Sequence, residues 1–210
     1  IMKTIIISGP SGSGKSILTN KLSKLFDNTI VLKTDSYYRD SILIKLLSIF
    51  IFDIYDRPLS LKRKEIHNAL KSISKKNRVI NSYYYDFKRK KSLKSKIKLN
   101  YEGTNQFLIL EGIFSHRLDL NYQETINIVC NEEKAICFNR RLERDQLERG
   151  RDSFEINKKF NKSWYLFYKY VKDHLNKNKI ITINTGNEIA YNNLIIYLHK
   201  ISKNKKTKQN

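Results

Sequence analysis

This 210-residue sequence has no long apolar run, only two prolines and only two cysteines. No stretch approaches the ~18 apolar residues that a membrane-spanning helix needs, and no secretory signal precedes the first strand-like run, so we expect a cytoplasmic protein without membrane contact. Cys130 and Cys137 lack further Cys or His residues at metal-ligand spacing. We therefore expect two reduced, packed thiols rather than a disulfide or a metal centre.

Acidic residues are also scarce, because 20 Asp and Glu stand against 41 Lys and Arg, for a net charge of +21. A basic surface attracts phosphate without sequence preference. However, the excess lysine accompanies abundant isoleucine and asparagine, a usage that an AT-biased genome also produces. The usual nucleic-acid recognition motifs are missing. We therefore expect no dedicated nucleic-acid partner.

A glycine-rich motif lies close to the start of the chain. Residues 9–16 fit the pattern G-x-x-x-x-G-K-[ST], which is typical of a loop that binds nucleotide phosphates. Glycines let backbone N–H groups turn toward phosphate oxygens, the lysine adds a charge near the β- and γ-phosphates, and the final hydroxyl can bind Mg²⁺. An apolar run before the motif and helical spacing after it favour this interpretation over a ligand-free turn. The predicted phosphate-binding residues are Gly9, Ser11, Gly12, Ser13, Gly14, Lys15 and Ser16.

Five strand-like runs alternate with longer stretches of helical periodicity. They cover residues 4–7, 29–32, 107–110, 126–130 and 180–183. This alternation predicts an α/β fold with a parallel sheet of about five strands and helices on both faces. Ligands of such sheets bind beyond the carboxyl ends of the strands, which nominates the glycine-rich loop, Asp35 and Glu111.

Each of the two carboxylates has a catalytic and a structural interpretation. Asp35 could accept a proton from a substrate hydroxyl near the γ-phosphate, or it could cap the next helical segment. Glu111 follows four apolar residues and precedes Gly112, where the backbone can turn sharply. Its carboxylate could hold a metal ion directly or through water, or it could form a structural ion pair.

An arginine-rich segment at residues 140–152 has helical periodicity. Arg141 and Arg144 share one face, and Gly150 is expected to end the helix and leave Arg149 and Arg151 on a mobile segment. Arginines placed in this way could close over a transferring phosphate. A salt-bridged surface helix is the alternative.

Other stretches carry weaker signals. The apolar residues 42–52 predict a buried helix or a subunit contact, and contact with a membrane surface is the alternative. The aromatic residues 83–87, followed by a basic run, could stack on a base or form an ordinary strand beside a solvated loop. The polar stretch that continues to Lys98 suggests an exposed loop or hairpin tip. Aromatic residues spaced along 160–175 predict core, and the basic residues 203–210 predict a frayed tail.

Taken in order, these motifs resemble the uridine kinase (uridine/cytidine kinase) family of phosphate-loop enzymes. The matching segments are residues 9–16, 35–40, 55–58, 85–87, 110–113 and 140–152. The last segment is the most specific, because the pattern R-R-x-x-R-D-x-x-E-R-G-R is hard to obtain by accident. The resemblance implies a P-loop NTPase-type domain over 1–202, with a nucleoside-binding insertion at about 36–100 and an arginine-bearing lid at about 141–162.

The same resemblance implies roles at the donor end of a kinase site. Asp35 would be the base for the ribose 5′-hydroxyl, while Ser16 and Glu111 would hold Mg²⁺. Lys15, Arg144 and Arg149 would act on the phosphates of ATP or GTP.

At the acceptor end, Asp56 would bind the ribose hydroxyls with help from Arg141. Tyr55, Tyr85 and Phe87 would shape the pocket for the base, and Arg151 would belong to the lid. The family typically makes UMP or CMP in pyrimidine salvage and forms a cytoplasmic homotetramer.

The acceptor end also departs from the family pattern. The H-[ST]-R motif expected after the Tyr-Asp-Phe segment is replaced by a basic run, and the expected Asp-His-Pro reads Asp-Arg-Pro at residues 56–58. A related kinase with another acceptor, resembling phosphoribulokinase or pantothenate kinase, is therefore the first alternative. A non-enzymatic phosphate-loop regulator that binds RNA is the second.

Overall fold

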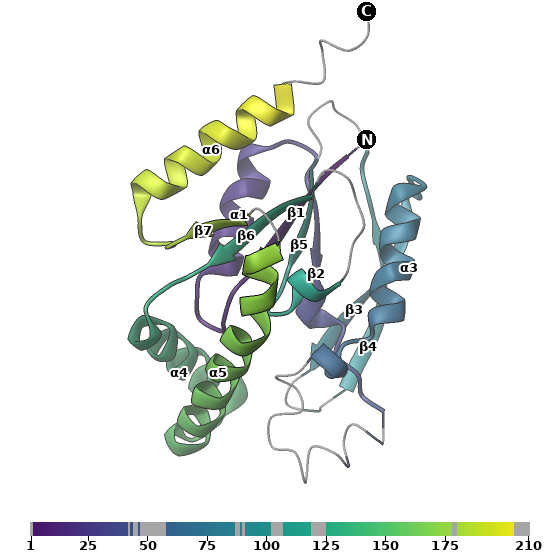
Figure 1. Ribbon diagram of the computed structural model, residues 1–210. Helices are drawn as coiled ribbons and strands as arrows, with labels where there is room; N and C mark the ends of the chain where they lie inside the picture. Colours follow the sequence, from purple (N-terminus) through teal and green to yellow (C-terminus); the bar gives the residue numbers. More distant parts are fainter. Residues whose placement is uncertain are drawn as a thin grey trace, which may run out of the picture.

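A five-stranded parallel sheet forms the centre of the computed structural model, which describes residues 2–41, 43, 46, 58–86, 89, 91–101, 107–118, 125–177 and 180–203 (Figure 1). The strand order is β2-β5-β1-β6-β7. The strands are β1 (Lys3–Ser8), β2 (Ile30–Lys33), β5 (Phe107–Glu111), β6 (Thr125–Cys130) and β7 (Ile180–Ile183). The predicted parallel α/β sheet and all five of its strands are confirmed.

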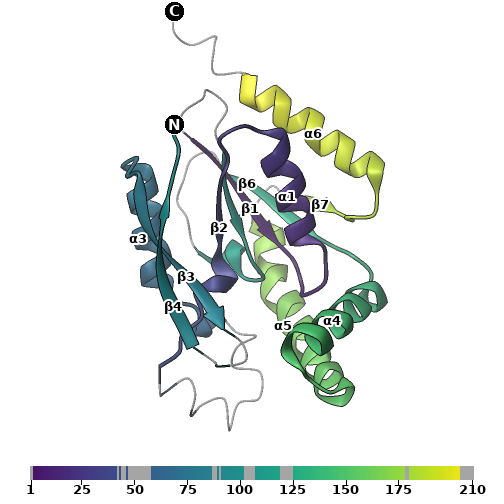
Figure 2. The ribbon, with the colours of Figure 1, turned by 180° about the vertical axis from the view of Figure 1, so that it is seen from behind.

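Both faces of the sheet are buried, which explains why its strands are apolar without alternation. Ile5 and Ile7 pack on one face, against α1 (Lys15–Leu25) and α6 (Glu188–Lys203). Ile6 packs on the opposite face, in a cluster with α3 (Arg63–Ser74). Val129 packs against α5 (Ser153–Lys177). Figures 1 and 2 view these two faces from opposite sides.

A smaller lobe lies beside the β2 edge of the sheet (Figure 1). It contains the short turns η1 (Thr34–Ser36) and η3 (Pro58–Ser60), helix α3, and an antiparallel pair made by β3 (Val79–Asp86) and β4 (Lys91–Lys98). The expectation of a loop or hairpin tip up to Lys98 was wrong, because backbone pairing with β3 extends through every residue of β4. Residues 83–86 accordingly form part of an ordinary strand.

Two helices follow β6 at the carboxyl end of the sheet. Helix α4 (Lys134–Arg149) ends at Gly150 as predicted, and the φ of 62° at Gly150 gives the helix a left-handed cap. Helix α5 then packs on α4, and Phe160, Phe167 and Val171 are buried as expected. A short turn, η4 (Ser115–Arg117), lies between β5 and β6 in the sequence.

Four further expectations concern membrane spans, the apolar stretch 42–52, the two cysteines and the basic tail. Among the described residues, no helix is long and apolar enough to cross a membrane. The apolar stretch 42–52 lies outside the described residues except for Leu43 and Leu46, whose exposed fractions are 65% and 51%. Both cysteines are buried and free, as predicted. Of the basic tail, only Lys203 is described, and it is the last residue of α6.

Candidate active site

The glycine-rich loop joins β1 to the N-terminus of α1. Gly12 and Gly14 both have a φ of 86°, which a residue with a side chain adopts only under strain. A Cβ on Gly12 would lie 2.2 Å from the Cys137 carbonyl oxygen, and one on Gly14 would lie 2.4 Å from Thr185 Oγ1. The loop is therefore held tightly between α4 and the segment after β7. The N-terminus of α1 adds a partial positive charge beside it.

Lys15 and Ser16 begin α1 and lie next to the end of β5. The Lys15 Nζ donates a hydrogen bond to the Pro10 carbonyl across the loop, at 3.0 Å. The Ser16 hydroxyl donates to Glu111 Oε1 at 3.3 Å, and Glu111 is only 5% exposed. A hydroxyl and a carboxylate oxygen side by side suit Mg²⁺, which prefers oxygen ligands and takes several of them from phosphate and water. In the described part of the chain, no group of three or more His, Cys, Asp or Glu residues could hold a metal ion.

Asp35 lies in the turn η1, directly after β2. Both of its carboxylate oxygens accept the Ile113 N–H, at 3.1 and 3.2 Å. Burial raises the pKa of Asp35 from 3.8 to about 6, despite the opposing charge of Lys15 and with a further increase from Glu111. These contacts link Asp35 to the loop after β5 and differ from those of the helix cap considered as an alternative.

Two hydroxyl groups that the sequence analysis overlooked connect the ends of β2 and β5. Thr34 Oγ1 donates to the Glu111 carbonyl at 3.2 Å and lies 2.9 Å from Ser115 Oγ. Gly112 allows this close approach, because a Cβ there would lie 2.1 Å from Thr34 Oγ1 and 2.7 Å from Asp35 Oδ1. The only sequence signal for Thr34 and Ser115 is their position just beyond strand ends.

A second overlooked group supports the phosphate loop from the other side. Thr185 Oγ1 lies 3.2 Å from both the Ser13 carbonyl oxygen and Glu132 Oε2. Arg140 donates to the Gly12 carbonyl at 3.2 Å and lies 3.6 Å from the same Glu132 carboxylate. Glu132 follows β6 and Thr185 follows β7, so the rule that nominated Asp35 and Glu111 could have found both.

The predicted lid arginines gather on α4 and just after it. Arg144 Nη2 donates to Ser11 Oγ of the phosphate loop at 3.3 Å. Arg149 and Arg151 both form ion pairs with Asp145. Arg141 is buried and donates to Ser163 Oγ of α5 at 2.7 Å, so its predicted contact with ribose stays a prediction. Helix α4 is thus salt-bridged, as one interpretation of the arginine-rich segment expects. Arg144 also contacts the phosphate loop, as the other interpretation expects.

The acceptor end is described only in part. Tyr85 is 3% exposed, and its ring meets that of Tyr38 edge to face with centroids 5.4 Å apart. Tyr55, Asp56 and Phe87 lie outside the described residues. Their predicted roles in nucleoside binding therefore remain predictions.

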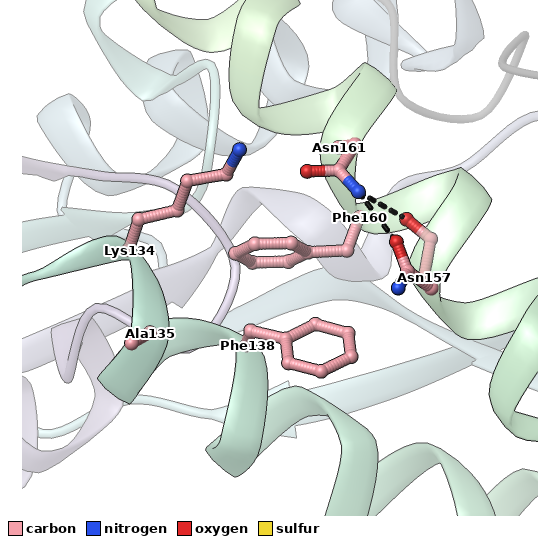
Figure 3. A pocket seen from close by; sticks show the side chains of 6 residues that line it. All are labelled: Lys134, Ala135, Phe138, Asn157, Phe160 and Asn161. Atoms are coloured by element: carbon pink, nitrogen blue, oxygen red, sulfur yellow. Dashed lines mark hydrogen bonds between the residues drawn. The ribbon is translucent and has the colours of Figure 1, made fainter.

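An apolar cavity of about 350 Å³ opens between α4 and α5 (Figure 3). Its floor is formed by the rings of Phe138 and Phe160, whose centroids lie 5.3 Å apart. The lining residues are Lys134, Ala135, Phe138, Asn157, Phe160 and Asn161. No predicted site residue lines it, so this cavity is separate from the phosphate loop.

Several known proteins are similar to this chain. A family model described as "Phosphoribulokinase / Uridine kinase family" matches residues 4–189. A uridine kinase of Borrelia duttonii is 32% identical over 154 residues, which cover 72% of this chain and 71% of that protein. A uridine kinase of Psychromonas ingrahamii is 29% identical over 167 residues, which cover 76% of each.

The fold has solved counterparts. A crystal structure described as a "putative fructose transport system kinase" from Silicibacter sp. TM1040 superposes with a TM-score of 0.58 at 14% identity, covering 80% of this chain and 85% of that one. Likeness at this identity concerns the fold, which is that of P-loop kinases. The family match over residues 4–189 shows that this chain belongs to the phosphoribulokinase/uridine kinase family.

Proposed function

We propose that this kinase transfers the γ-phosphoryl group of ATP or GTP to the 5′-hydroxyl of uridine or cytidine, giving UMP or CMP for pyrimidine salvage. The observation that carries the proposal is the position of Asp35. Its carboxylate is anchored on Ile113 and electrostatically coupled to Lys15, Glu111 and Arg144. A carboxylate of raised pKa beside a phosphate loop is suited to accept the proton of an attacking hydroxyl.

In the proposed mechanism, the chain acts mainly by positioning and by neutralising charge. Backbone N–H groups of the loop and Lys15 bind the triphosphate. Asp35 orients the acceptor hydroxyl in line with the γ-phosphate and takes its proton. Arg144 and Arg149 donate hydrogen bonds to oxygens on which negative charge develops.

Ser16 and Glu111 are the residues that would hold Mg²⁺. Bound there, the ion would neutralise charge on the β- and γ-phosphate oxygens. In the same proposal, Asp56 and Arg141 bind the ribose, and Tyr55, Tyr85, Phe87 and Arg151 enclose the nucleoside. The resemblance to uridine kinases also supports a cytoplasmic homo-oligomer, with the tetramer as the expected form.

The experiment that tests the acceptor is a panel of uridine, cytidine, adenosine, ribulose 5-phosphate and pantothenate with labelled ATP. We expect transfer to uridine and cytidine, and size-exclusion chromatography with light scattering to report an oligomer. Turnover with ribulose 5-phosphate or pantothenate alone would replace the nucleoside assignment with another acceptor. Salt-sensitive RNA binding without any acceptor-dependent ADP release would favour the non-enzymatic regulator.

A further inference from the structure

Asp145 in α4 is the centre of an unusual ion cluster. Its side chain is 0% exposed, and four guanidinium groups surround it. Arg144 Nη2 lies 2.7 Å from Oδ1 and Arg149 Nη1 lies 3.3 Å from the same oxygen. Arg151 Nη1 lies 3.0 Å and Arg141 Nε 3.6 Å from Oδ2. We call these five residues the Asp145 cluster.

The turn after α4 brings Arg151 back over Asp145. Gly150 adopts the left-handed conformation that ends the helix, and the Arg151 N–H donates to the Asp145 carbonyl at 3.3 Å. Arg151 therefore approaches the Asp145 carboxylate from the turn that follows α4, while Arg141, Arg144 and Arg149 approach from the helix itself. Backbone and side chain of Asp145 fix the same turn.

The charges in the Asp145 cluster do not balance. Four arginines against one carboxylate leave three positive charges in excess. Burial alone would raise the pKa of Asp145, but the charges of Arg144, Arg149 and Arg141 outweigh it and hold the pKa below its usual range. Burial and the neighbouring Arg144 lower the pKa of Arg149 to about 10. A protein gathers like charges in this way at a cost, which an anionic ligand can offset.

The phosphate loop is the adjacent site for such an anion. Arg144 bonds to Asp145 through Nε and Nη2, and the same Nη2 also reaches Ser11 Oγ at 3.3 Å. Arg144 is also close enough to Asp35 to affect its pKa. The cluster thus extends from the core of α4 to the candidate phosphate site.

We propose that Asp145 is a positioning residue, which holds Arg144 and Arg149 in place for the transferring phosphoryl group. The inference rests on the proposed function, because it assumes that these two arginines meet the donor phosphates. Asp145 itself touches no substrate. Its carboxylate fixes the direction of the guanidinium groups before the nucleotide binds, and the positive charge of Arg144 and Arg149 remains in place for the triphosphate.

If Asp145 positions the arginines, its loss should lower kcat without weakening the binding of ADP. Asp145→Asn keeps the size and one acceptor oxygen but raises the excess charge from three to four. Attraction for a polyanion is then undiminished, while the repelling arginines lose their common anchor. We expect kcat to fall about 100-fold, the loss typical for a displaced donor to a developing charge, without weaker binding of ADP.

The experiment compares wild type, Asp145→Asn and the control Glu143→Gln. Glu143 is an exposed carboxylate on the same helix, so its change removes the same charge away from the cluster. Isothermal titration measures the affinity for ADP with Mg²⁺, alone and with aluminium fluoride, which mimics the transferring phosphoryl group. We expect aluminium fluoride to tighten ADP binding to wild type and to Glu143→Gln, and this gain to shrink about 100-fold in Asp145→Asn.

The outcomes distinguish the two proposals. If wild type gains nothing from aluminium fluoride and no acceptor is phosphorylated, the proposed phosphoryl transfer fails. If wild type and a folded Asp145→Asn gain equally, or if ADP affinity falls in parallel with kcat, the positioning role fails.

A second variant covers the case in which Asp145→Asn does not fold. The double variant Asp145→Asn/Arg151→Gln returns the excess charge to three and relieves repulsion within the cluster. Arg151→Gln alone is its control, because Arg151 is itself proposed to enclose the nucleoside. We expect the double variant to fold, to bind ADP normally and to have a kcat about 100-fold below that of Arg151→Gln. A kcat equal to that of Arg151→Gln would mean that Asp145 only balances charge and does not position the arginines.

Discussion

The donor and acceptor ends of this site are built in different ways. At the donor end, the phosphate loop, Asp35 and Glu111 extend from adjacent parallel strands whose backbones are buried on both faces. At the acceptor end, Tyr85 lies in a two-stranded hairpin whose second strand carries exposed lysines. The proposed donor residues thus belong to one edge of the central sheet, while Tyr85, the described residue of the proposed acceptor end, belongs to a separate two-stranded hairpin.

The largest effect is expected from removing the proposed base at the donor end. Asp35→Asn keeps the shape and an acceptor for the Ile113 N–H but cannot take a proton. We expect kcat to fall about 10³-fold, while ADP affinity measured by titration calorimetry stays within about threefold. Near-normal turnover would contradict the assignment of Asp35 as the base.

The same variant should be more stable than wild type at neutral pH. Folding raises the Asp35 pKa from 3.8 to about 6. At any pH above the unfolded-state pKa of 3.8, the ionised carboxylate therefore destabilises the native state. We expect a gain of up to about 3 kcal/mol at pH 7 in urea unfolding, which disappears below about pH 4. A loss of stability at pH 7 would show that the low kcat reports unfolding.

Rigidity of the phosphate loop can be tested with two matched glycine substitutions. Gly12→Ala and Gly150→Ala both place a side chain at positive φ, but only the first would clash with the backbone of α4. We expect Gly12→Ala to lower ADP affinity about 100-fold, or about 3 kcal/mol, and Gly150→Ala to cost only about 1 kcal/mol of stability. Equal effects in calorimetry and thermal unfolding would contradict a tightly held loop.

The pH dependence of activity offers a test without mutation. Because Asp35 must be ionised to accept a proton, activity falls as pH drops through its raised pKa of about 6. We expect kcat/KM for the nucleotide to fall about tenfold per pH unit below that value. The Glu143→Gln variant should show the same pH profile. If the activity of wild type began to fall only near pH 4, the prediction would be wrong.

The smallest effect is expected at the acceptor end. Tyr85→Phe keeps the packing against Tyr38 and removes only one hydroxyl. We expect KM for uridine to rise no more than about fivefold, equivalent to one neutral hydrogen bond, with KM for ATP unchanged. A parallel rise in both KM values would mean that the two ends are not independent.

Local patterns predicted most of the sheet and part of the site. The strands were recognisable because buried parallel strands are short apolar runs, and Gly150 marks the end of α4. Strand β4 was missed because four of its eight residues are lysines and only Leu93 and Ile97 are apolar, and pairing with β3 defines it instead. Asp145 is visible within a motif, but nothing in the spacing shows that four arginines converge on it.

The sequence by itself determined the glycine-rich loop, the five strand segments and the positions of Asp35 and Glu111 at strand ends, because each depends on residues close together in the chain. Tertiary structure decided how these groups work together. Thr34 meets the carbonyl of Glu111 across 77 residues of sequence, and Arg144 meets Ser11 across 133. Such contacts depend on the packing of strands and helices, which places distant side chains at one edge of the sheet.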